Sequence, residues 1–190
     1  MADFELKSAR QLAAEVQRQV LRPGDMAVDC TLGNGHDTCF LAECVGPTGR
    51  VIGFDIQREA VERTARRLAE AGLAQRCSLI CAGHEHLAEY IAEPVRCIVF
   101  NLGWLPGGDK RFTTQWTTTE QAVRAALGLL QPMGVLTLCA YPGHEEGARE
   151  LAALTALFSA LRPQEYNALH QRFLNAGPGA PECFVIQRQR

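Results

Sequence analysis

The stretch MAVDCTLGNGHDT, residues 26–38, places a short apolar run, a glycine-rich turn and the start of a helix in direct succession. The run at 26–30 predicts a buried strand, and the stretch 36–44 predicts a helix. Gly33 and Gly35 permit positive φ and let the backbone approach a ligand, while the free N–H groups of the next helix favour an anionic group such as a carboxylate. The same residues are also compatible with a tight turn that binds nothing.

Apolar runs and amphipathic stretches keep alternating along the chain. An amphipathic helix with Asp3 as its N-cap is expected at 4–21. Further strands are expected at 50–55, 77–81, 95–101 and 135–141, with helices at 57–71, 84–91, 118–130 and 145–161. Thr118 and Gln121 have the spacing of a capping box for the helix 118–130. Two closing strands are expected at 165–174 and 183–188.

Five βα units followed by a β-hairpin predict an α/β fold. Apolar strands between amphipathic helices indicate a mostly parallel, seven-stranded sheet that is covered on both faces and ends in an antiparallel hairpin. The length of 190 residues fits a single domain over 1–190, with the helix 4–21 packed on it. Ligands of such sheets bind beyond the carboxyl ends of the strands, so the residues that follow each strand are the site candidates.

The composition excludes several classes of protein. The hydrophobic fraction is 47%, the charged fraction 21% and the net charge −2, as in a globular protein and unlike a disordered or fibrous chain. No apolar run reaches the roughly 18 residues of a membrane span, and the charged N-terminus is unlike a signal peptide. The eight cysteines form no CxxC pair, so we expect free thiols in a reducing cytoplasm and no metal site.

Asp55 follows the second expected strand, about twenty residues beyond the glycine loop. A carboxylate there accepts hydrogen bonds from both hydroxyls of a ribose. Its alternative role is the N-cap of the helix 57–71. The chain has neither the G-x-G-x-x-G of a dinucleotide site nor the G-x-x-x-x-G-K-[ST] of a P-loop. The glycine loop and Asp55 therefore indicate another nucleoside-bearing cofactor.

Polar and aromatic side chains also follow the fourth and fifth strands. Asn101 ends a strongly apolar strand, where a buried amide needs hydrogen-bonding partners. Trp104 follows it in a loop, and the alternative for this ring is to plug the edge of the sheet. Tyr141 and His144 follow the fifth strand, where they suit contact with a substrate or simply mark the start of a helix.

The aspartate-led glycine loop, the acid after the second strand and the closing hairpin together resemble the class I S-adenosylmethionine-dependent methyltransferases. The resemblance implies a Rossmann-like domain with S-adenosylmethionine as its cofactor. It implies that the methionine part lies against the glycine loop, the ribose against Asp55, and adenine against the residues after the third strand. The cofactor-binding residues it implies are Gly33, Asn34, Gly35, Asp37, Thr38, Asp55, Gln57, His84 and Glu85. Loop or helix-capping chemistry is the alternative for His84.

Residues 101–104 resemble the Asn/Asp-Pro-Pro-aromatic motif of amino-group methyltransferases, with Leu102-Gly103 in place of Pro-Pro. In that motif the amide oxygen and a following carbonyl accept the N–H bonds of the acceptor amine, and the aromatic ring stacks on its base. The resemblance implies these roles for Asn101 and Trp104. A free alkylamine is mostly protonated near neutral pH, so we hypothesise that His144 or Tyr141 assists its deprotonation.

Motifs that cover nearly the whole chain resemble the MnmM-type family of tRNA methyltransferases. The motifs, in order, are VDCTLGNGHDT, GFDIQ, NLGWLPGGDK, a threonine-led helix at 117–130 and YPGH-x-x-G. The resemblance implies methylation of 5-aminomethyl-2-thiouridine to 5-methylaminomethyl-2-thiouridine at the tRNA wobble position, with the anticodon loop as partner. The candidate RNA contacts are Lys110 and Arg111, with Arg10, Arg18, Arg22, Arg58, Arg63, Arg66 and Arg67.

Other interpretations stay open from the sequence alone. The first is an N-methyltransferase that acts on rRNA or on a small amine. The second is a cofactor-binding partner subunit without turnover, against which the segment 101–104 argues. A dehydrogenase is disfavoured by the spacing of the glycine loop. A homodimer could form through the helix 4–21 or the terminal hairpin, and the sequence does not decide the oligomeric state.

Overall fold

The structure, a computed structural model, describes residues 5–104 and 113–190. The strands of its sheet are β1 (Met26–Asp29), β2 (Arg50–Phe54), β3 (Cys77–Ile80), β4 (Val95–Asn101), β5 (Leu130–Ala140), β6 (Tyr166–Gln171) and β7 (Glu182–Arg188). The helices are α1 (Ala9–Val20), α2 (His36–Val45), α3 (Arg58–Glu70), α4 (Leu87–Tyr90), α5 (Trp116–Leu129) and α6 (Glu145–Ser159). Short 3-10 turns lie at η1 (Ala74–Arg76) and η2 (His84–His86).

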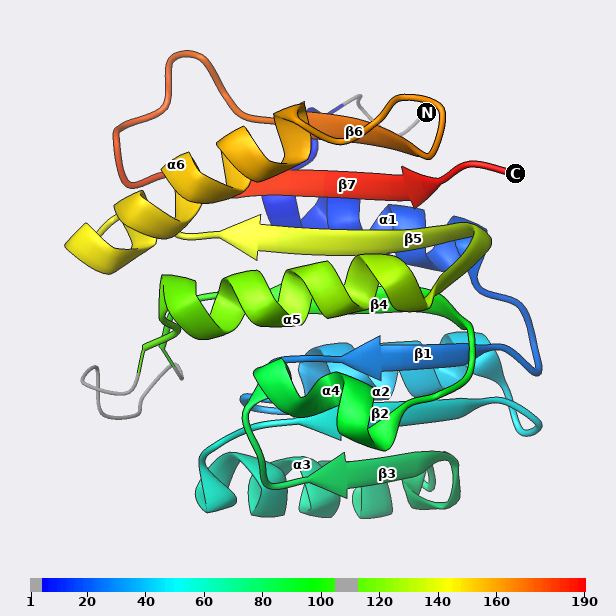
Figure 1. Cartoon of the computed structure of the whole chain (residues 1–190). Helices are drawn as coiled ribbons and strands as arrows, with labels where there is room; N and C mark the ends of the chain where they lie inside the picture. The colour runs from blue at the N-terminus through cyan, green and yellow to red at the C-terminus, as the bar shows by residue number, and fades with distance from the viewer. Residues whose placement is uncertain (1–4, 105–112) are drawn as a thin grey trace.

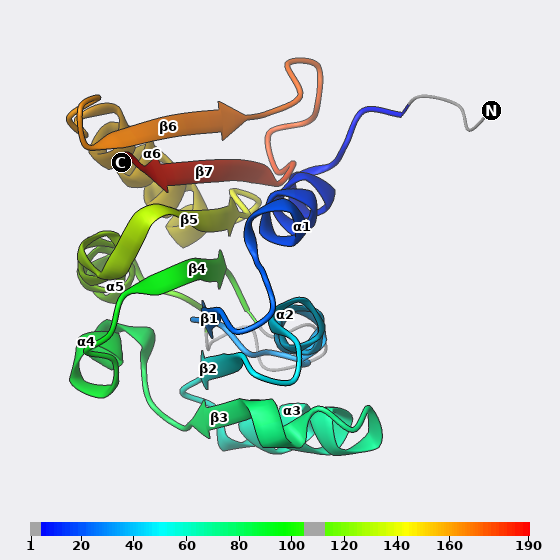
Figure 2. The ribbon, with the colours of Figure 1, turned by 90° about the vertical axis from the view of Figure 1, so that its right-hand side faces the viewer.

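The strands lie in the order β3-β2-β1-β4-β5-β7-β6 (Figure 1). The first five are parallel to one another, and β7 runs antiparallel to both β5 and β6. Helices α1, α2 and α3 cover one face of the sheet, while α4, α5 and α6 cover the other (Figure 2). The predicted mostly parallel, seven-stranded sheet with a closing antiparallel hairpin is therefore confirmed.

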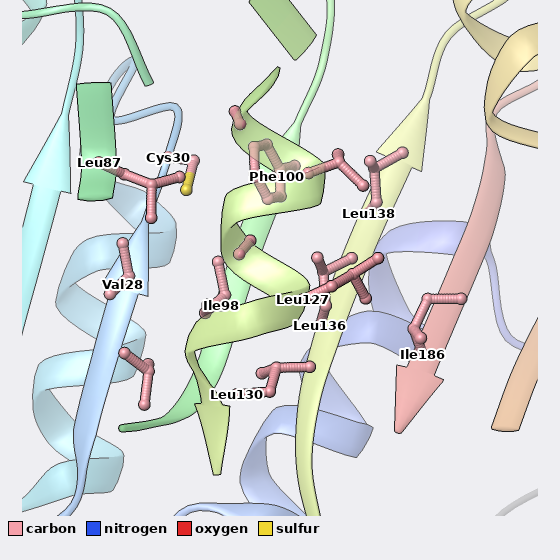
Figure 3. Packing of buried hydrophobic residues seen from close by; sticks show 14 of the residues in the cluster. Val28, Cys30, Leu87, Ile98, Phe100, Leu127, Leu130, Leu136, Leu138 and Ile186 are labelled. Atoms are coloured by element: carbon pink, nitrogen blue, oxygen red, sulfur yellow. The ribbon is translucent and has the colours of Figure 1, made fainter. Parts of the chain in front are cut away.

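Strand β4 is buried on both of its faces, which explains its continuous apolar sequence. Ile98 and Phe100 belong to the core under α5 (Figure 3), whereas Cys97 and Val99 belong to the core on the opposite face, with residues of α2. All four side chains are at most 2% exposed. This packing holds the carboxyl end of β4, and Asn101 with it, in a fixed position at the centre of the sheet.

The predicted start of the first helix is wrong. Helix α1 begins at Ala9, and its N-cap is Ser8. The Gln11 N–H donates to the Ser8 hydroxyl at 3.4 Å, and the Ser8 N–H donates to the Gln11 side chain at 2.8 Å, which makes a capping box. The expected cap, Asp3, lies outside the described residues. The Ser-x-x-Gln spacing was present in the sequence and outweighs the amphipathic pattern before it.

Helix α5 also begins earlier than predicted, at Trp116, and it has no capping box. The Thr118 hydroxyl donates to the Gln115 carbonyl at 3.0 Å, and the Trp116 N–H is bound by the Glu146 carboxylate at 2.9 Å. A contact from another helix therefore replaces the local cap. Strand β5 begins at Leu130 instead of 135, since Leu130 pairs with Val95 of β4. The other predicted elements lie within a few residues of their observed bounds.

Candidate active site

Glycine residues shape the turn between β1 and α2, and helix α3 holds that turn in place. Gly33 and Gly35 have φ values of 52° and 77°, and Gly35 is the N-cap of α2. Arg67 donates from Nε to the Asn34 carbonyl at 2.8 Å, and Arg63 donates to the Asn34 side chain at 3.1 Å. The two glycines therefore allow the backbone conformation of the loop, and two arginines of α3 fix its position.

Gly35 leaves no room for a side chain, which gives a test of the loop. A Cβ at Gly35 would lie 2.8 Å from the Thr64 hydroxyl and 3.0 Å from the Thr64 Cα, whereas one at Gly72, also with positive φ, would have no atom within 4 Å. Gly72→Ala is expected to cost only the backbone strain, about 1–2 kcal/mol of unfolding free energy. Gly35→Ala is expected to cost about 1–3 kcal/mol more, because the added methyl group must displace α3. Urea denaturation of both variants measures the difference, and equal losses would contradict this packing.

Asp55, directly after β2, joins the loop after β1 to the loop after β2. Its Oδ2 accepts the Gly33 N–H at 3.0 Å, and its Oδ1 accepts the Gln57 N–H at 2.9 Å. Gln57, and not Asp55, is the N-cap of α3, so the alternative role from the sequence is wrong. Burial raises the pKa of Asp55, and these two hydrogen bonds oppose that rise. Each carboxylate oxygen keeps a lone pair for a ligand hydroxyl in the cavity.

Asp29, the last residue of β1, is a buried carboxyl group behind the loop. It is 0% exposed, and it accepts hydrogen bonds from the Thr38 hydroxyl at 2.6 Å and the Thr31 N–H at 3.1 Å. Burial, and after it the negative charge of Asp37, raises the pKa of Asp29 from 3.8 to about 7. Asp29 leads the glycine-loop motif of the sequence but is not among the predicted site residues.

The raised pKa of Asp29 predicts a pH-dependent stability. The folded protein holds the Asp29 proton more tightly than the unfolded chain, so this stabilisation is present below about pH 4 and is lost as the pH rises to about 7. Asp29→Asn keeps the shape without the charge. Its free energy of unfolding, relative to wild type, is expected to rise by up to about 4 kcal/mol between about pH 4 and pH 8. Urea titrations across this range test the effect, and a difference independent of pH would contradict it.

Asn101 lies at the centre of a hydrogen-bonded chain that joins β4 to α2 and to the loops after β1 and β5. Its Nδ2 donates to Asp37 of α2 at 2.5 Å, and its Oδ1 accepts the Tyr141 hydroxyl at 3.0 Å. Its backbone N–H donates to the Thr31 hydroxyl at 2.8 Å. Arg10 of α1 extends the chain, with Nη2 3.7 Å from Asp37. The Asn101 amide is thus held at both of its ends, and Oδ1 retains one lone pair.

Tyr141 donates its hydrogen bond, whereas His144 accepts its own, and the His144 Nε2 has no partner within the described residues. Burial raises the pKa of Tyr141 to about 12, so its hydroxyl stays protonated and donates to Asn101. The His144 Nδ1 accepts the Gly147 N–H at 3.1 Å, so the proton of the neutral ring lies on Nε2. The centroid of that ring lies 4.7 Å from the Trp104 ring. Neither contact favours the base role that the sequence analysis considered.

His84 and Glu85 follow β3, as expected, and His84 is the better defined of the two. The His84 Nδ1 lies 3.2 Å from the Cys30 carbonyl and therefore carries the proton, which leaves Nε2 as an acceptor. This Nε2 is buried and has no hydrogen-bond partner within the described part of the chain. Burial lowers the pKa of His84. His86 points elsewhere and lies 2.7 Å from Glu89, so the pair does not converge on a metal.

A cavity of about 560 Å³ at the carboxyl ends of the strands brings most of these residues together. The predicted site residues that line it are Gly33, Asn34, Asp37, Asp55, Gln57, His84, Glu85, Asn101, Trp104, Tyr141 and His144. Gly35 and Thr38 do not line it. Gly35 is the N-cap of α2, and the Thr38 hydroxyl donates to Asp29. Lys110 and Arg111 lie outside the described residues. Over residues 5–104 and 113–190, no group of three His, Cys, Asp or Glu could hold a metal ion.

Sequence reasoning missed part of the cavity wall. The residues it missed include Leu32, Phe54, Ile56, Leu102, Gln115 and Thr118. Phe54 and Ile56 flank Asp55, so their positions beside a strand end were a usable signal. Arg10 lines the cavity although its place on the first helix suggested an RNA contact. Another arginine in that group, Arg22, donates to the Gln19 and Leu21 carbonyls at the end of α1.

The sheet order and the cavity at its carboxyl edge define a class I S-adenosylmethionine-dependent methyltransferase. Within that class, the model of the "Putative rRNA methylase" family matches residues 51–187, and the chain belongs to this family. A second model, for protein-L-isoaspartate O-methyltransferase, matches residues 6–92 only. No helix in the described part of the chain is both long and apolar enough to cross a bilayer.

Several known proteins are similar over nearly the whole chain. The tRNA (mnm(5)s(2)U34)-methyltransferase of Arabidopsis thaliana chloroplasts is 34% identical over 98% of this chain and 72% of its own length. A "putative rRNA-methylase" from Clostridium thermocellum has a TM-score of 0.95 at 34% identity, over 97% of this chain and 100% of its own. A "putative methyltransferase" from Streptococcus mutans, solved with SAH, has a TM-score of 0.89 at 30% identity, over 97% and 99%.

The residues around the cavity fit S-adenosylmethionine. The carboxylates of Asp37 and Asp55 suit a ligand that carries a positive sulfonium and ribose hydroxyls. The buried, unpartnered Nε2 of His84 is an acceptor on the same wall and suits an amino group of a base. Phe54 and Ile56 supply apolar surface against which a planar ring can pack.

Proposed function

We propose that the chain is a tRNA methyltransferase that converts 5-aminomethyl-2-thiouridine at the wobble position to 5-methylaminomethyl-2-thiouridine. The observation that carries the proposal is the Asn101 amide, held at both ends by Asp37 and Tyr141 on the wall of the cofactor cavity. Such an amide can orient an amine but offers no nucleophile of its own. The Arabidopsis thaliana relative, similar over 98% of this chain, supports the choice of tRNA.

In this proposal Asn101 aligns the acceptor amine. Its Oδ1 accepts one N–H of the amine with the remaining lone pair, while Tyr141 and Asp37 keep the amide from rotating. When bound, S-adenosylmethionine supplies the methyl group from its sulfonium. Trp104, packed on the His144 ring, offers a face on which the thiouridine base stacks. Holding the nitrogen in line with the methyl group supplies most of the rate gain as orientation.

The amine must lose its proton before it can attack. Tyr141 is held as a donor and the His144 Nδ1 is occupied by the Gly147 N–H, so both are positioning residues here. Asp37 is bonded to Asn101 and, as a carboxylate, has only acceptor atoms. We therefore assign the departing proton to Asp37. The charge of the bound sulfonium and burial of the substrate lower the pKa of the amine and favour this transfer.

We assign the other residues that line the cavity to parts of the cofactor and of the tRNA. Asp55 binds the ribose hydroxyls and His84 binds adenine, while the loop 33–38 binds the methionine part. The tRNA anticodon loop is the proposed partner, and Arg10 at the cavity rim is the described basic residue best placed to meet its backbone. The exposed Leu169 and Leu174 of the terminal hairpin support a homodimer face there. The eight free thiols support a location in the reducing cytoplasm, where thiols stay unpaired. The proposed protein is a single domain over residues 1–190.

Mass spectrometry of wobble nucleosides tests the function. Purified protein is incubated with S-adenosylmethionine and tRNA that carries the 5-aminomethyl group, and a gain of one methyl group on that nucleoside is expected. Tyr141→Phe, which retains Asn101 and the cavity, serves as a partly active control. Transfer to rRNA or to a free small amine but not to tRNA would replace the proposed substrate. Cofactor binding without transfer to any RNA would leave only a binding subunit.

A further inference from the structure

Helix α6 buries a carboxylate near the part of the cavity that Trp104, Tyr141 and His144 line, which we call the acceptor end. No step described above uses this carboxylate. Glu150 is 1% exposed. Its Oε1 accepts the Thr119 hydroxyl at 2.6 Å, and its Oε2 accepts the Thr114 hydroxyl at 2.7 Å. Burial raises the pKa of Glu150, and these two hydrogen bonds oppose that rise. Burying a carboxyl group costs folding free energy unless its hydrogen-bonding partners are held in place. We therefore ask what Glu150 contributes to the site.

Thr114 connects Glu150 to the segment that carries Trp104. The Gly103 N–H donates to the Thr114 hydroxyl at 2.9 Å, and the Thr114 N–H donates to the Gly103 carbonyl at 3.0 Å. An antiparallel bridge joins Trp104 to Thr113. The chain on both sides of residues 105–112 is therefore joined to itself, and Thr114 joins it to α6.

The same helix supports the acceptor end at two further points. The His144 ring, at the N-cap of α6, packs on Trp104. Glu146 accepts the Trp116 N–H at 2.9 Å and so fixes the first turn of α5. Glu150 itself does not line the cavity. Its hydrogen bonds reach the acceptor side and do not reach the Gly33 loop or Asp55.

We propose that Glu150 is a positioning residue for methyl transfer, which acts through Thr114 to hold Gly103 and Trp104 where the acceptor base stacks. The identity of that base rests on the proposed function. Loss of the contact lets Trp104 move away from the His144 ring, and the acceptor amine then leaves the line of attack. The cofactor side of the cavity keeps all its contacts. Glu150 therefore affects the use of tRNA and leaves the affinity for S-adenosylmethionine unchanged.

Three variants separate positioning from general stability. Glu150→Leu removes both acceptor oxygens, and Thr114→Val removes the hydroxyl that joins Glu150 to the Gly103 N–H while the bond from the Thr114 N–H to the Gly103 carbonyl remains. Both are expected to lower kcat/KM for tRNA by about 10- to 100-fold. Thr119→Val removes the other hydroxyl of the same buried cluster and is the matched control, expected to keep tRNA turnover near wild type. The Kd for S-adenosylmethionine, from calorimetry, is expected to stay unchanged in all three.

Fluorescence tests the position of Trp104 without any RNA. In a Trp116→Phe background Trp104 is the remaining tryptophan, because the sequence contains two. Glu150→Leu and Thr114→Val are expected to shift its emission, and Thr119→Val is not. Unchanged emission in the first two variants, or equal activity losses in Thr114→Val and Thr119→Val, would overturn the proposal. Failure of the wild type to methylate tRNA would overturn the proposed function alone, because the emission of Trp104 would still decide the role of Glu150.

Discussion

Asn101→Ala is expected to lower kcat for methyl transfer to tRNA by about 100- to 1000-fold, the range seen when one preorganised hydrogen-bonding group is removed from an active site. The alanine removes the Oδ1 that aligns the amine, and it leaves Asp37 and Tyr141 without their shared partner. The Kd for S-adenosylmethionine is expected to change little, since the contacts of Asp55 and of the Gly33 loop are untouched. Single-turnover kinetics with hypomodified tRNA measure the chemical step.

Tyr141→Phe is the matched control for this prediction. It deletes only the hydroxyl that donates to Asn101, and Asp37 still holds the other end of the amide. A loss of about 10-fold in kcat is expected, in keeping with one neutral hydrogen bond. The raised pKa of Tyr141 predicts that this loss is the same across neutral pH. An Asn101→Ala enzyme as active as Tyr141→Phe would remove Asn101 from the chemistry.

Asp55→Asn is expected to weaken S-adenosylmethionine binding by about 100-fold with little change in kcat at saturating cofactor. Asp55 accepts the N–H groups of Gly33 and Gln57 with its two oxygens. An asparagine has one oxygen, so its NH₂ group must face one of these N–H donors, and an acceptor for the ribose hydroxyls is lost. Isothermal titration calorimetry gives the Kd directly.

The matched control for Asp55→Asn is Glu62→Gln, which removes the same charge from an exposed position on α3. It is expected to bind S-adenosylmethionine as wild type does, because exposed charges outside the cavity are screened by solvent. An Asp55→Asn variant with a Kd within about threefold of wild type would show that Asp55 serves only to join the two loops.

The sequence predicts which strand-end residues line the cavity, for a physical reason. Parallel strands bring their carboxyl ends to one edge, so residues that follow successive strands meet there regardless of their separation along the chain. Asp55 and His84 follow strands, Asn101 ends one, and all three line the cavity. Here local patterns were sufficient, because burial of the strands on both faces leaves their apolar runs unambiguous.

The acceptor side depends on contacts that have no local pattern. Arg10 reaches the cavity because α1 packs across β5 and β7, strands far along the chain. Glu150 looks like any helix residue until its contacts with Thr114 and Thr119 are seen. The donor role of Tyr141 follows from its burial, and the occupied Nδ1 of His144 follows from the Gly147 N–H, neither of which the sequence displays.

Helix α1 is synthesised well before β5 and β7, yet it packs against both of these strands. Until β7 has left the ribosome, Ala9 and Ala13 of α1 and the neighbouring Tyr141 lack Cys183, a residue of the cluster in which they pack. A nascent chain can therefore pair β1, β2 and β3, which carry the Gly33 loop and Asp55, before the side of the cavity formed by Arg10 and Tyr141 is complete. The docking of α1, which brings Arg10 to the cavity, is therefore expected to be completed late in synthesis.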